Sequence, residues 1–258
     1  MGGSSQGTSG TLLAVAKNYF DERIAERCET YWPELFEPAV VDPAVDFLAD
    51  LAGTGAALEL GIGTGRIALP LSRRGVPVHG IDLSPAMVVQ LRTKAGAETI
   101  GVTIGDFATT SVDKTFTLAY LVRNTIMNLT TQEEQVECFR NVAAHLEPGG
   151  CFVIEVLVPG LQRLPPGEKI QAFTVTPTHL GFDDYVDLAA QVSFSRHYWM
   201  IDGQLETFSA PFRYVWPSEL DLMARLAGMT LRERWGDWNR VPFKSDSREH
   251  VSVWEKAT

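Results

Sequence analysis

The stretch LELGIGTGR (58–66), together with GIDL (80–83), decides the fold that we expect for this chain. An apolar run typical of a buried strand leads into a glycine-rich turn, and a carboxylate ends the next apolar run. Glycines at such a turn let a ligand approach the backbone, and the N–H groups that open the following helix point at that ligand. Asp82 follows Gly61 by 21 residues, which is about the separation expected for a carboxylate that binds ribose hydroxyls.

The spacing of the glycines separates this turn from a dinucleotide-binding fingerprint. That fingerprint has glycine at its first, third and sixth positions, whereas here the third glycine is Gly65 at the fifth position and Arg66 occupies the sixth. Glu59 lies just before the turn. A carboxylate there disfavours a pyrophosphate and suits a ligand with an ammonium or sulfonium group. The turn therefore predicts a site for an adenosine-containing cation.

Strands and helices alternate around this stretch. We expect strands over residues 56–60, 77–81, 100–104, 116–122 and 151–158, and helices over 64–74, from Ser84, and from the capping box at Thr131 and Glu134. Pro70 is expected to bend the first of these helices. The alternation predicts βαβ units, and therefore an α/β fold with a Rossmann-like, doubly wound, mostly parallel sheet.

Helical periodicity precedes the sheet. Apolar positions recur at helical spacing over residues 11–31, and Asp42 as N-cap with Pro43 in the first turn predicts a helix through Leu51. Residues 1–10, MGGSSQGTSG, lack the basic and apolar regions of a signal peptide, so we expect a flexible tail. The N-terminal helices and the cofactor-binding core would together occupy residues 11–158.

The pattern changes over residues 159–216. Segments that favour β-structure follow one another without helices, and Asp202-Gly203 is a strong hairpin signal. We expect an antiparallel β lobe inserted into the α/β core, which returns at residues 217–258 with one helix and two strands. Alternation along residues 194–201 predicts that even-numbered side chains share one face of the lobe and odd-numbered ones the other.

Composition narrows the function classes. The 258 residues include 32 Asp and Glu against 22 Lys and Arg, a net charge of −10. Nucleic acids and anionic membranes require clustered basic residues, so we expect neither as a partner. Cys28, Cys138 and Cys151 have no paired spacing, which predicts a cytoplasmic protein without a structural metal. No apolar stretch is long enough to span a membrane.

Several motifs together resemble those of one family. ELGIGTGR (59–66), GIDLS (80–84) and TIGDF (103–107) are similar to the cofactor motifs of class I S-adenosylmethionine-dependent methyltransferases. The turn LEPGG (146–150) resembles the one before that family's fifth strand, and RYVWPSELDLMARLAGM (213–229) is similar to its small-molecule branch. The resemblance covers about residues 19–158, with closing elements at 217–255.

The resemblance implies S-adenosyl-L-methionine as the cofactor. Asp82 would accept hydrogen bonds from both ribose hydroxyls, with Glu59 just before the loop. The other positions that the resemblance places around the cofactor are Gly61, Gly63 and Gly65 at its methionine and ribose portion, Leu83, Met87, Asp106 and Phe107 at its adenine, and Leu121 near the methionine.

The N-terminal segment departs from the family pattern. Many relatives have Tyr-Asp there and a second Tyr eight residues after the first, whereas this chain has Phe20-Asp21 and then Cys28. Tyr19 and Tyr31 are near enough in sequence to take the place of the missing tyrosines. Which of the two closes over the cofactor stays open at this point.

The implied reaction is an in-line transfer of a methyl group to the nitrogen or oxygen of a small-molecule acceptor. Alignment alone can supply up to about 7–11 kcal/mol of such a barrier, so the sequence need not contain an obligatory base. An acceptor that must lose a proton would find His179, His197 or Tyr198 in the lobe, and Arg123 and Asn124 after the fourth strand could orient it.

Alternatives remain open for the function and for the lobe. A catalytically silent regulatory module would keep the cofactor motifs but lack an acceptor pocket. An NAD-dependent oxidoreductase would share the βαβ unit and Asp82, although the glycine spacing and Glu59 argue against it. The lobe is expected to cap the acceptor site, and its alternative role is to join two copies in a homodimer.

Overall fold

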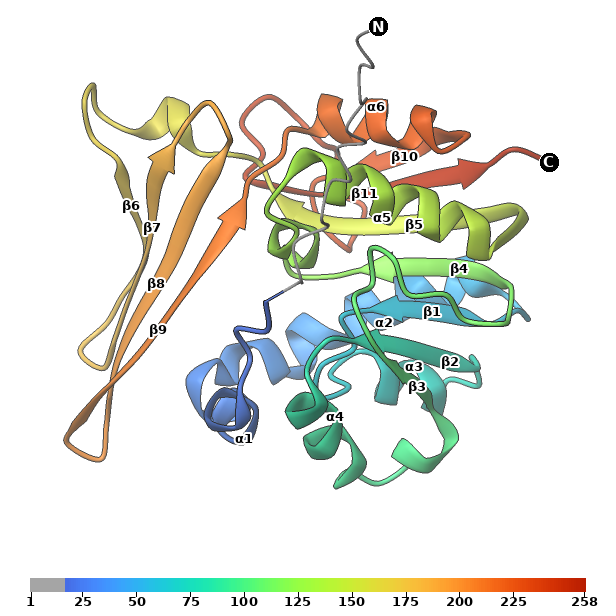
Figure 1. Cartoon of the computed structure of the whole chain (residues 1–258), viewed down its shortest axis with the longest axis horizontal. Coiled ribbons are helices and arrows are strands. Elements are labelled where there is room, and N and C mark those ends of the chain that lie inside the picture. The colour runs from blue at the N-terminus through green and yellow to red at the C-terminus, as the bar shows by residue number, and fades with distance from the viewer. Residues whose placement is uncertain (1–16) are drawn as a thin grey trace, which may run out of the picture.

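The computed structural model describes residues 17–258, and its main sheet has the doubly wound α/β arrangement that the sequence predicts (Figure 1). The strand order is β10-β11-β5-β4-β1-β2-β3. The bounds are β1 (Ala57–Leu60), β2 (Val78–Asp82), β3 (Gly101–Ile104), β4 (Phe116–Leu121), β5 (Leu146–Leu157), β10 (Met229–Trp235) and β11 (Glu249–Lys256). Strands β1 to β5 run parallel, whereas β11 is antiparallel to both of its neighbours.

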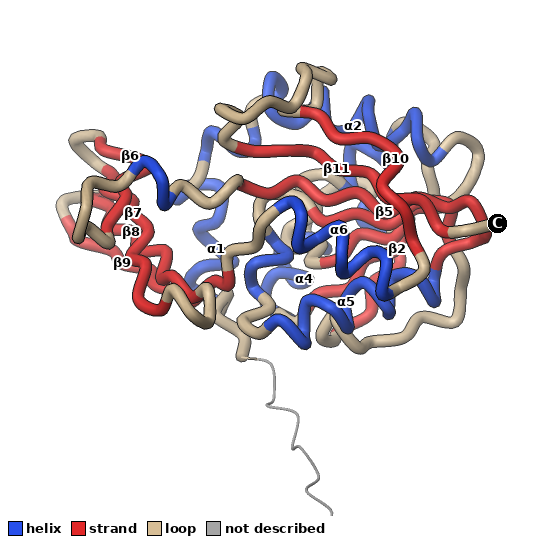
Figure 2. The backbone as a smooth tube through the Cα atoms, turned by 90° about the horizontal axis from the view of Figure 1, so that it is seen from above, coloured by secondary structure: helices blue, strands red, loops and turns tan. Residues whose placement is uncertain are grey.

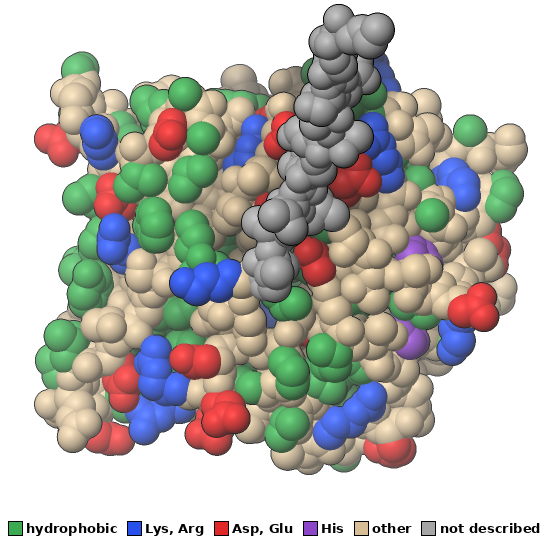
Figure 3. Space-filling view, in the orientation of Figure 1, with side chains coloured by type: hydrophobic (Ala, Val, Ile, Leu, Met, Phe, Trp, Pro, Cys, Tyr) green, Lys and Arg blue, Asp and Glu red, His purple; other side chains and the backbone are tan. Residues whose placement is uncertain are grey.

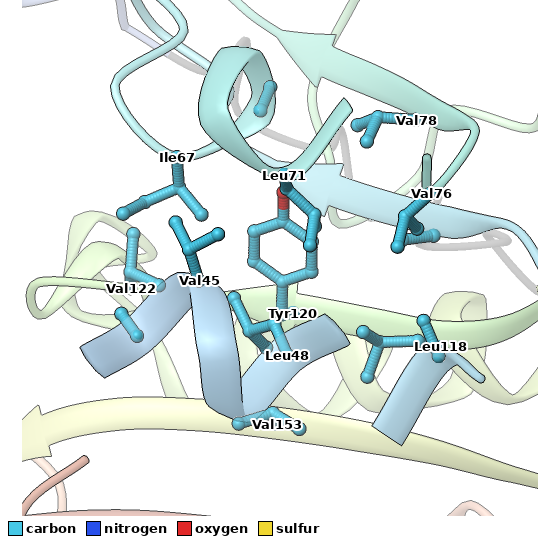
Figure 4. Packing of buried hydrophobic residues seen from close by; sticks show 14 of the residues in the cluster. Val45, Leu48, Ile67, Leu71, Val76, Val78, Leu118, Tyr120, Val122 and Val153 are labelled. Atoms are coloured by element: carbon cyan, nitrogen blue, oxygen red, sulfur yellow. The ribbon is translucent and has the colours of Figure 1, made fainter. Parts of the chain in front are cut away.

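Helices cover both faces of this sheet. They are α1 (Glu22–Tyr31), α2 (Pro38–Ala52), α3 (Ala68–Arg73), α4 (Pro85–Arg92), α5 (Gln132–His145) and α6 (Pro217–Leu226). Val45 and Leu48 of α2 pack with Tyr120 of β4 on one face (Figure 4). Phe139 of α5 and Leu220 of α6 pack on the other, and Figure 2 shows α2 opposite α5 and α6. Burial on both faces explains why the parallel strands are almost wholly apolar.

Two of the predicted helix starts are confirmed by their caps. The Thr131 hydroxyl accepts a hydrogen bond from the Glu134 N–H (3.1 Å), and the Glu134 carboxylate accepts one from the Thr131 N–H (2.9 Å). The Ser84 hydroxyl likewise accepts from the Met87 N–H (3.3 Å), with Pro85 in the first turn of α4. Side-chain caps of this kind satisfy N–H groups that a helix leaves without partners.

The helix before the sheet begins earlier than predicted. α2 starts at Pro38, so Pro43 lies inside the helix rather than at its first turn. Pro38 itself suits the first turn, where proline loses no hydrogen bond, and the buried Val45 and Leu48 stabilise the helix around Pro43. The predicted helical period over residues 11–20 is not confirmed: residues 17–20 precede α1 without helical structure. Residues 1–16, including the predicted tail, lie outside the described part.

The elements around the glycine turn also differ from the prediction. α3 begins at Ala68 rather than Thr64, because residues 64–67 complete the turn. Pro70 therefore lies in the first turn of α3, where it removes no hydrogen bond, and it does not bend the helix. β5 begins at Leu146 rather than Cys151, because Leu146 already pairs with Phe116 of β4.

The lobe is an antiparallel sheet that stands apart from the main sheet, at the left of Figure 1. Its strands are β6 (Ile170–Val175), β7 (His179–Asp187), β8 (Val192–Ile201) and β9 (Gln204–Arg213), hydrogen-bonded in that order. Asp202 and Gly203 join β8 to β9 with φ angles of 51° and 75°, which the tight turn of a hairpin requires. Ser195, His197 and Trp199 are buried on one face of β8, as the alternation predicts.

That buried face of the lobe, here called the inner face, packs against α1 and the residues after it. The Tyr31 and Trp199 rings stack with centroids 4.3 Å apart, and Trp32 meets the edge of Trp199 at 5.2 Å. Arg23 and Arg27 of α1 both pair with Glu206 of β9, at 3.2 Å and 2.8 Å. α1 therefore connects the lobe to the core.

A buried arginine fixes the other end of the lobe. Arg213 donates hydrogen bonds to Gln135 of α5 (2.5 Å), Glu219 of α6 (2.7 Å) and Gln191 (3.2 Å). Only about 5% of the Arg213 side chain is exposed. A buried charge of this kind is stable only with its partners in place, so the return of the chain from the lobe to α6 is tightly defined.

No helix among residues 17–258 combines the length and apolarity that crossing a membrane requires. Within the same residues, no three His, Cys, Asp or Glu side chains are arranged to hold a metal ion.

Candidate active site

The glycine turn after β1 is the centre of the candidate site. Gly61 and Gly65 have φ angles of 71° and 79°, which favour glycine. A Cβ atom at Gly65 would lie 2.3 Å from a Leu91 methyl carbon, and one at Gly61 would lie 2.7 Å from the Thr125 side chain. Close packing and backbone conformation both therefore require glycine here.

Asp82 joins this turn to the end of β2. One carboxylate oxygen accepts a hydrogen bond from the Gly63 N–H (2.6 Å), and the other accepts one from the Ser84 N–H (2.8 Å). Burial raises the pKa of Asp82, and these two hydrogen bonds oppose the rise. Each carboxylate oxygen can accept more than one hydrogen bond, so Asp82 keeps capacity for two further donors.

Glu59 lies inside the core below the turn. It is 2% exposed and accepts a hydrogen bond from the Tyr120 hydroxyl at 2.9 Å. Burial raises the pKa of Glu59 to about 8, against the opposing effects of the Tyr120 hydrogen bond and the Arg66 charge. At neutral pH Glu59 is therefore mostly protonated, and it joins β1 to β4 beneath the turn.

The predicted adenine residues lie on the neighbouring strand ends. Asp106, after β3, accepts a hydrogen bond from the Ala108 N–H (2.8 Å). The Phe107 ring is buried and comes within 4.0 Å of where a Gly61 Cβ would be. Met87 is buried against α1, while Leu83 is half-buried. The structure thus brings Phe107 to the turn.

The end of β4 has an unusual backbone. After the buried Leu121, Arg123 and Asn124 have φ angles of 51° and 64°. Glu155 of β5 holds both: its carboxylate accepts from the Arg123 N–H (2.7 Å), and its carbonyl accepts from the Asn124 N–H (3.1 Å). Left-handed residues other than glycine are uncommon and concentrate at functional sites. This supports the prediction that Arg123 and Asn124 belong to the site.

The N-terminal segment approaches the same edge of the sheet. The Ser84 hydroxyl donates a hydrogen bond to the Phe20 carbonyl at 2.5 Å, so the neighbouring Tyr19, half-buried, lies close to the turn. Tyr31 instead packs with the lobe, where it is 1% exposed and stacked on Trp199. Both tyrosines thus pack in the apolar cluster that contains Met87, and the Ser84 hydrogen bond ties the segment that carries Tyr19 to the end of β2.

The lobe brings two of the three predicted catalytic side chains together. His179 Nε2 and His197 Nδ1 are 2.9 Å apart, and His197 Nε2 is 3.3 Å from the Ser195 hydroxyl. Burial and, to a smaller extent, the neighbouring His179 lower the pKa of His197 to about 4. Tyr198 points from the opposite face and stacks on Phe182 at 6.0 Å. The pleat of β8 thus separates Tyr198 from the histidines.

Sequence reasoning did not single out Ser195 or Asp183, which share the inner face with the histidines. These two residues come together only because β7 pairs with β8, and a single sequence does not show which strands pair.

An open hollow of about 460 Å³, lined in part by Asp113 and His145, lies beside the start of β4. It is thus at the opposite edge of the sheet from the glycine turn.

Comparisons with known proteins bear on this site. A family profile described as a methyltransferase domain matches residues 57–150. Over 210 residues the chain is 30% identical to the cypemycin N-terminal methyltransferase of a Streptomyces species, covering 77% of this chain and 82% of that protein.

Two solved structures are also similar. The CcbJ methyltransferase from Streptomyces caelestis matches with a TM-score of 0.81 at 34% identity, over 93% of this chain and 98% of that one. The SAM-bound amino pentose methyltransferase CalS10 from Micromonospora echinaspora matches with a TM-score of 0.63 at 21% identity, over 83% of this chain and 88% of that one. The second likeness concerns the fold alone.

We predict that Glu59→Gln gains stability relative to the wild type as the pH rises from 5 to 8. The pKa of Glu59 is raised from 4.5 to about 8, so within this window the folded protein keeps a proton that the unfolded chain releases. Wild-type stability therefore falls with rising pH, and the glutamine removes this loss. Urea unfolding of both proteins at pH 5, 6.5 and 8 measures the difference, and a difference that stays constant with pH would contradict the prediction.

Proposed function

Because the chain belongs to the class I S-adenosylmethionine-dependent methyltransferases, we propose that it methylates the nitrogen of a small-molecule amine. It is an enzyme, and its cofactor is S-adenosyl-L-methionine, as the sequence predicts. The relatives named above are methyltransferases, which favours this activity over the regulatory-module and oxidoreductase alternatives. The observation that carries the cofactor part of the proposal is the Asp82 carboxylate held 2.6 Å from the Gly63 N–H at the carboxyl edge of the sheet.

The choice of nitrogen rests on a relative. The 30%-identical protein is named as an N-terminal methyltransferase of cypemycin. That name supports an amine acceptor here without identifying it. The transfer forms a nitrogen–carbon bond while the carbon–sulfur bond of the cofactor breaks, and the positive charge moves from sulfur to nitrogen.

The residues at the glycine turn fit the cofactor. Asp82 has acceptor capacity for both ribose hydroxyls, since each of its oxygens receives one backbone hydrogen bond. We place Tyr19 over the cofactor, and Glu59 supports the turn from below. The remaining proposed contacts are the backbone of Gly61, Gly63 and Gly65 along the methionine and ribose, Leu83, Met87, Asp106 and Phe107 around the adenine, and Leu121 near the methionine.

The cofactor supplies an electrophilic methyl group, and the protein's task is to align the acceptor with it. We propose that the lobe caps the acceptor site. Strand ends of a parallel sheet form its ligand crevice, and the chain leaves β5 at that edge to build the lobe (Figure 1). His179 and His197 stay neutral at pH 7, because burial lowers the pKa of both. Tyr198, on the other face, has no part in this proposal.

We propose no nucleic acid or membrane as a partner. Figure 3 shows acidic and basic side chains interspersed over one face of the molecule, without a large basic patch there. Cys28, Cys138 and Cys151 are free thiols, which supports the proposed cytoplasmic location. A homodimer stays a prediction, for which the exposed apolar side chains of the lobe, such as Met200 and Leu205, offer a surface.

The proposed reaction is tested by incubating the protein and S-adenosyl-L-methionine with matched pairs of amines and alcohols. Suitable pairs are glucosamine with glucose, and piperidine with 4-hydroxytetrahydropyran, among larger sets of amino sugars and cyclic amines. Mass spectrometry is expected to find methylated products among the amines and none among the alcohols. Methylation confined to the alcohols would overturn the proposal of nitrogen transfer while leaving the cofactor assignment intact.

The cofactor site is tested by Asp82→Ala. A hydrogen bond to a charged acceptor contributes about 1.5–3 kcal/mol, so we expect S-adenosylhomocysteine to bind about 10–100 times more weakly. Calorimetric titration measures this change, and Asp113→Ala, at an exposed position beside the start of β4, is the control. Unchanged affinity in Asp82→Ala would place the ribose elsewhere.

A further inference from the structure

Asp183 is a carboxylate on the inner face of the lobe. The pairing of β7 with β8 sets Asp183 opposite Ser195, so both side chains lie on the face that carries His197. This register sets the Ser195 hydroxyl beside the Asp183 carboxylate. Asp183 itself is half-buried.

This carboxylate has no cation beside it. Among residues 17–258, no Lys, Arg or His nitrogen lies within 4 Å of Asp183, and residues 1–16 contain no Lys, Arg or His. Its neighbour Asp184 points from the opposite face and pairs with Arg196 at 3.2 Å. The aspartate on the face opposite the inner face therefore forms an ion pair with an arginine, whereas the aspartate on the inner face forms none with the described residues.

A half-buried carboxylate without a cationic partner is costly. Removing a charge from water destabilises a protein unless a partner compensates. Burial raises the pKa of Asp183 to about 6, and the Ser195 hydrogen bond only partly opposes the rise. A destabilising charge of this kind is typical of a binding site, where the bound ligand supplies the missing partner.

The position of Asp183 along the inner face also points to a ligand. On one side, Trp32 covers His197, with ring centroids 5.5 Å apart. On the other side, the Tyr185 ring packs on Tyr214 at 5.5 Å. Asp183 lies between these covered ends and keeps part of its surface exposed.

Hydrogen bonds behind Asp183 orient it. If the Ser195 hydroxyl donates to Asp183, its oxygen accepts from His197 Nε2–H (3.3 Å), and His197 Nδ1 then accepts from His179 Nε2–H (2.9 Å). Both histidines are neutral in this arrangement, which agrees with the lowered pKa of each. Every donor in the series points toward Asp183, and such a series stabilises a negative charge at its end.

From this geometry we infer that Asp183 binds the acceptor's amine nitrogen and gives the enzyme its preference for amines over alcohols. The inference rests on the proposed function. The acceptor binds as an ammonium ion and releases one proton to solvent water before the transfer. The nitrogen lone pair then forms the new bond to carbon, and the electron pair of the broken carbon–sulfur bond goes to sulfur. The nitrogen becomes an ammonium whose N–H groups donate to Asp183, which stabilises charge that develops during the transfer. A methylated alcohol ends as a neutral ether and offers no such donor.

In this arrangement Ser195, His197 and His179 are positioning residues. They hold the carboxylate without touching the acceptor. In this proposal His179 and His197, which the sequence predicts as proton acceptors, act instead as donors behind Asp183.

The test compares Asp183→Asn with Asp184→Asn, which changes the adjacent carboxylate on the other face. The probes are glucosamine with glucose and piperidine with tetrahydropyran, titrated by calorimetry or nuclear magnetic resonance onto protein saturated with S-adenosylhomocysteine. We expect the wild type and Asp184→Asn to bind the amine of at least one pair about tenfold more tightly than its neutral counterpart. Asp183→Asn is expected to lose this preference while binding S-adenosylhomocysteine with unchanged affinity.

The pH dependence separates recognition from a merely structural role. The groups near Asp183 that titrate are Tyr185, whose pKa burial raises to about 12, and His197 and His179 beyond Ser195. The amine preference of the wild type is expected to fall below about pH 6, where Asp183 takes up a proton, whereas Asp183→Asn shows none at any pH.

Several outcomes would overturn the inference. They are an amine preference that persists in Asp183→Asn, its loss in Asp184→Asn, and a wild type that shows no preference within any pair. Failure of the proposed function has a different signature, which is methylation by the wild type that is confined to the alcohols. If Asp183→Asn unfolds, Ser195→Ala replaces it and is expected to weaken the preference in the same direction.

Discussion

The hydrogen bonds of Asp82 are the constraint on which the rest of the site depends. One carboxylate holds the glycine turn through Gly63 and the start of α4 through Ser84. Ser84 in turn donates to the Phe20 carbonyl, so the segment that enters α1 is fixed to the same strand end. α1 then carries Tyr31 to Trp199 of the lobe. A continuous series of contacts therefore runs from the glycine turn to the lobe, and these contacts fix one end of the lobe relative to the turn.

Much of this fold could be predicted from the sequence because its signals are local. The capping box at Thr131, the cap at Ser84 and the hairpin at Asp202 each lie within four residues of chain, and the structure confirms all three. The predicted bounds were wrong where tertiary packing, and not the local sequence, determines where an element begins. α2 extends back to Pro38 because its apolar residues pack on the sheet, and no local pattern distinguishes that start from the one predicted at Asp42.

The candidate site likewise has one part that the sequence predicts and another part that it does not. The turn and Asp82 follow a spacing that a single sequence displays, because strand, turn and helix are consecutive. The proximity of Asp183, Ser195 and His197 depends instead on the pairing of β7 with β8. The left-handed backbone of Arg123 and Asn124 depends on Glu155, more than 30 residues away. Neither sequence spacing nor residue type indicates these relations, since the partners meet only when the sheets form.

The adjacent residues Asp183 and Asp184 show how the alternation of side chains along a strand gives two neighbours different surroundings. The two residues have the same side chain, yet Asp184 pairs with Arg196 while Asp183 lies beside Ser195 and Gln171 in the sheet. A shift of one residue in the pairing of β7 would exchange their faces, since side chains alternate along a strand. The buried Tyr185 of β7 opposes that shift, because it would move away from its contact with Tyr214 to the other face of the lobe. Aromatic packing at one end of the lobe thus determines which carboxylate faces the core.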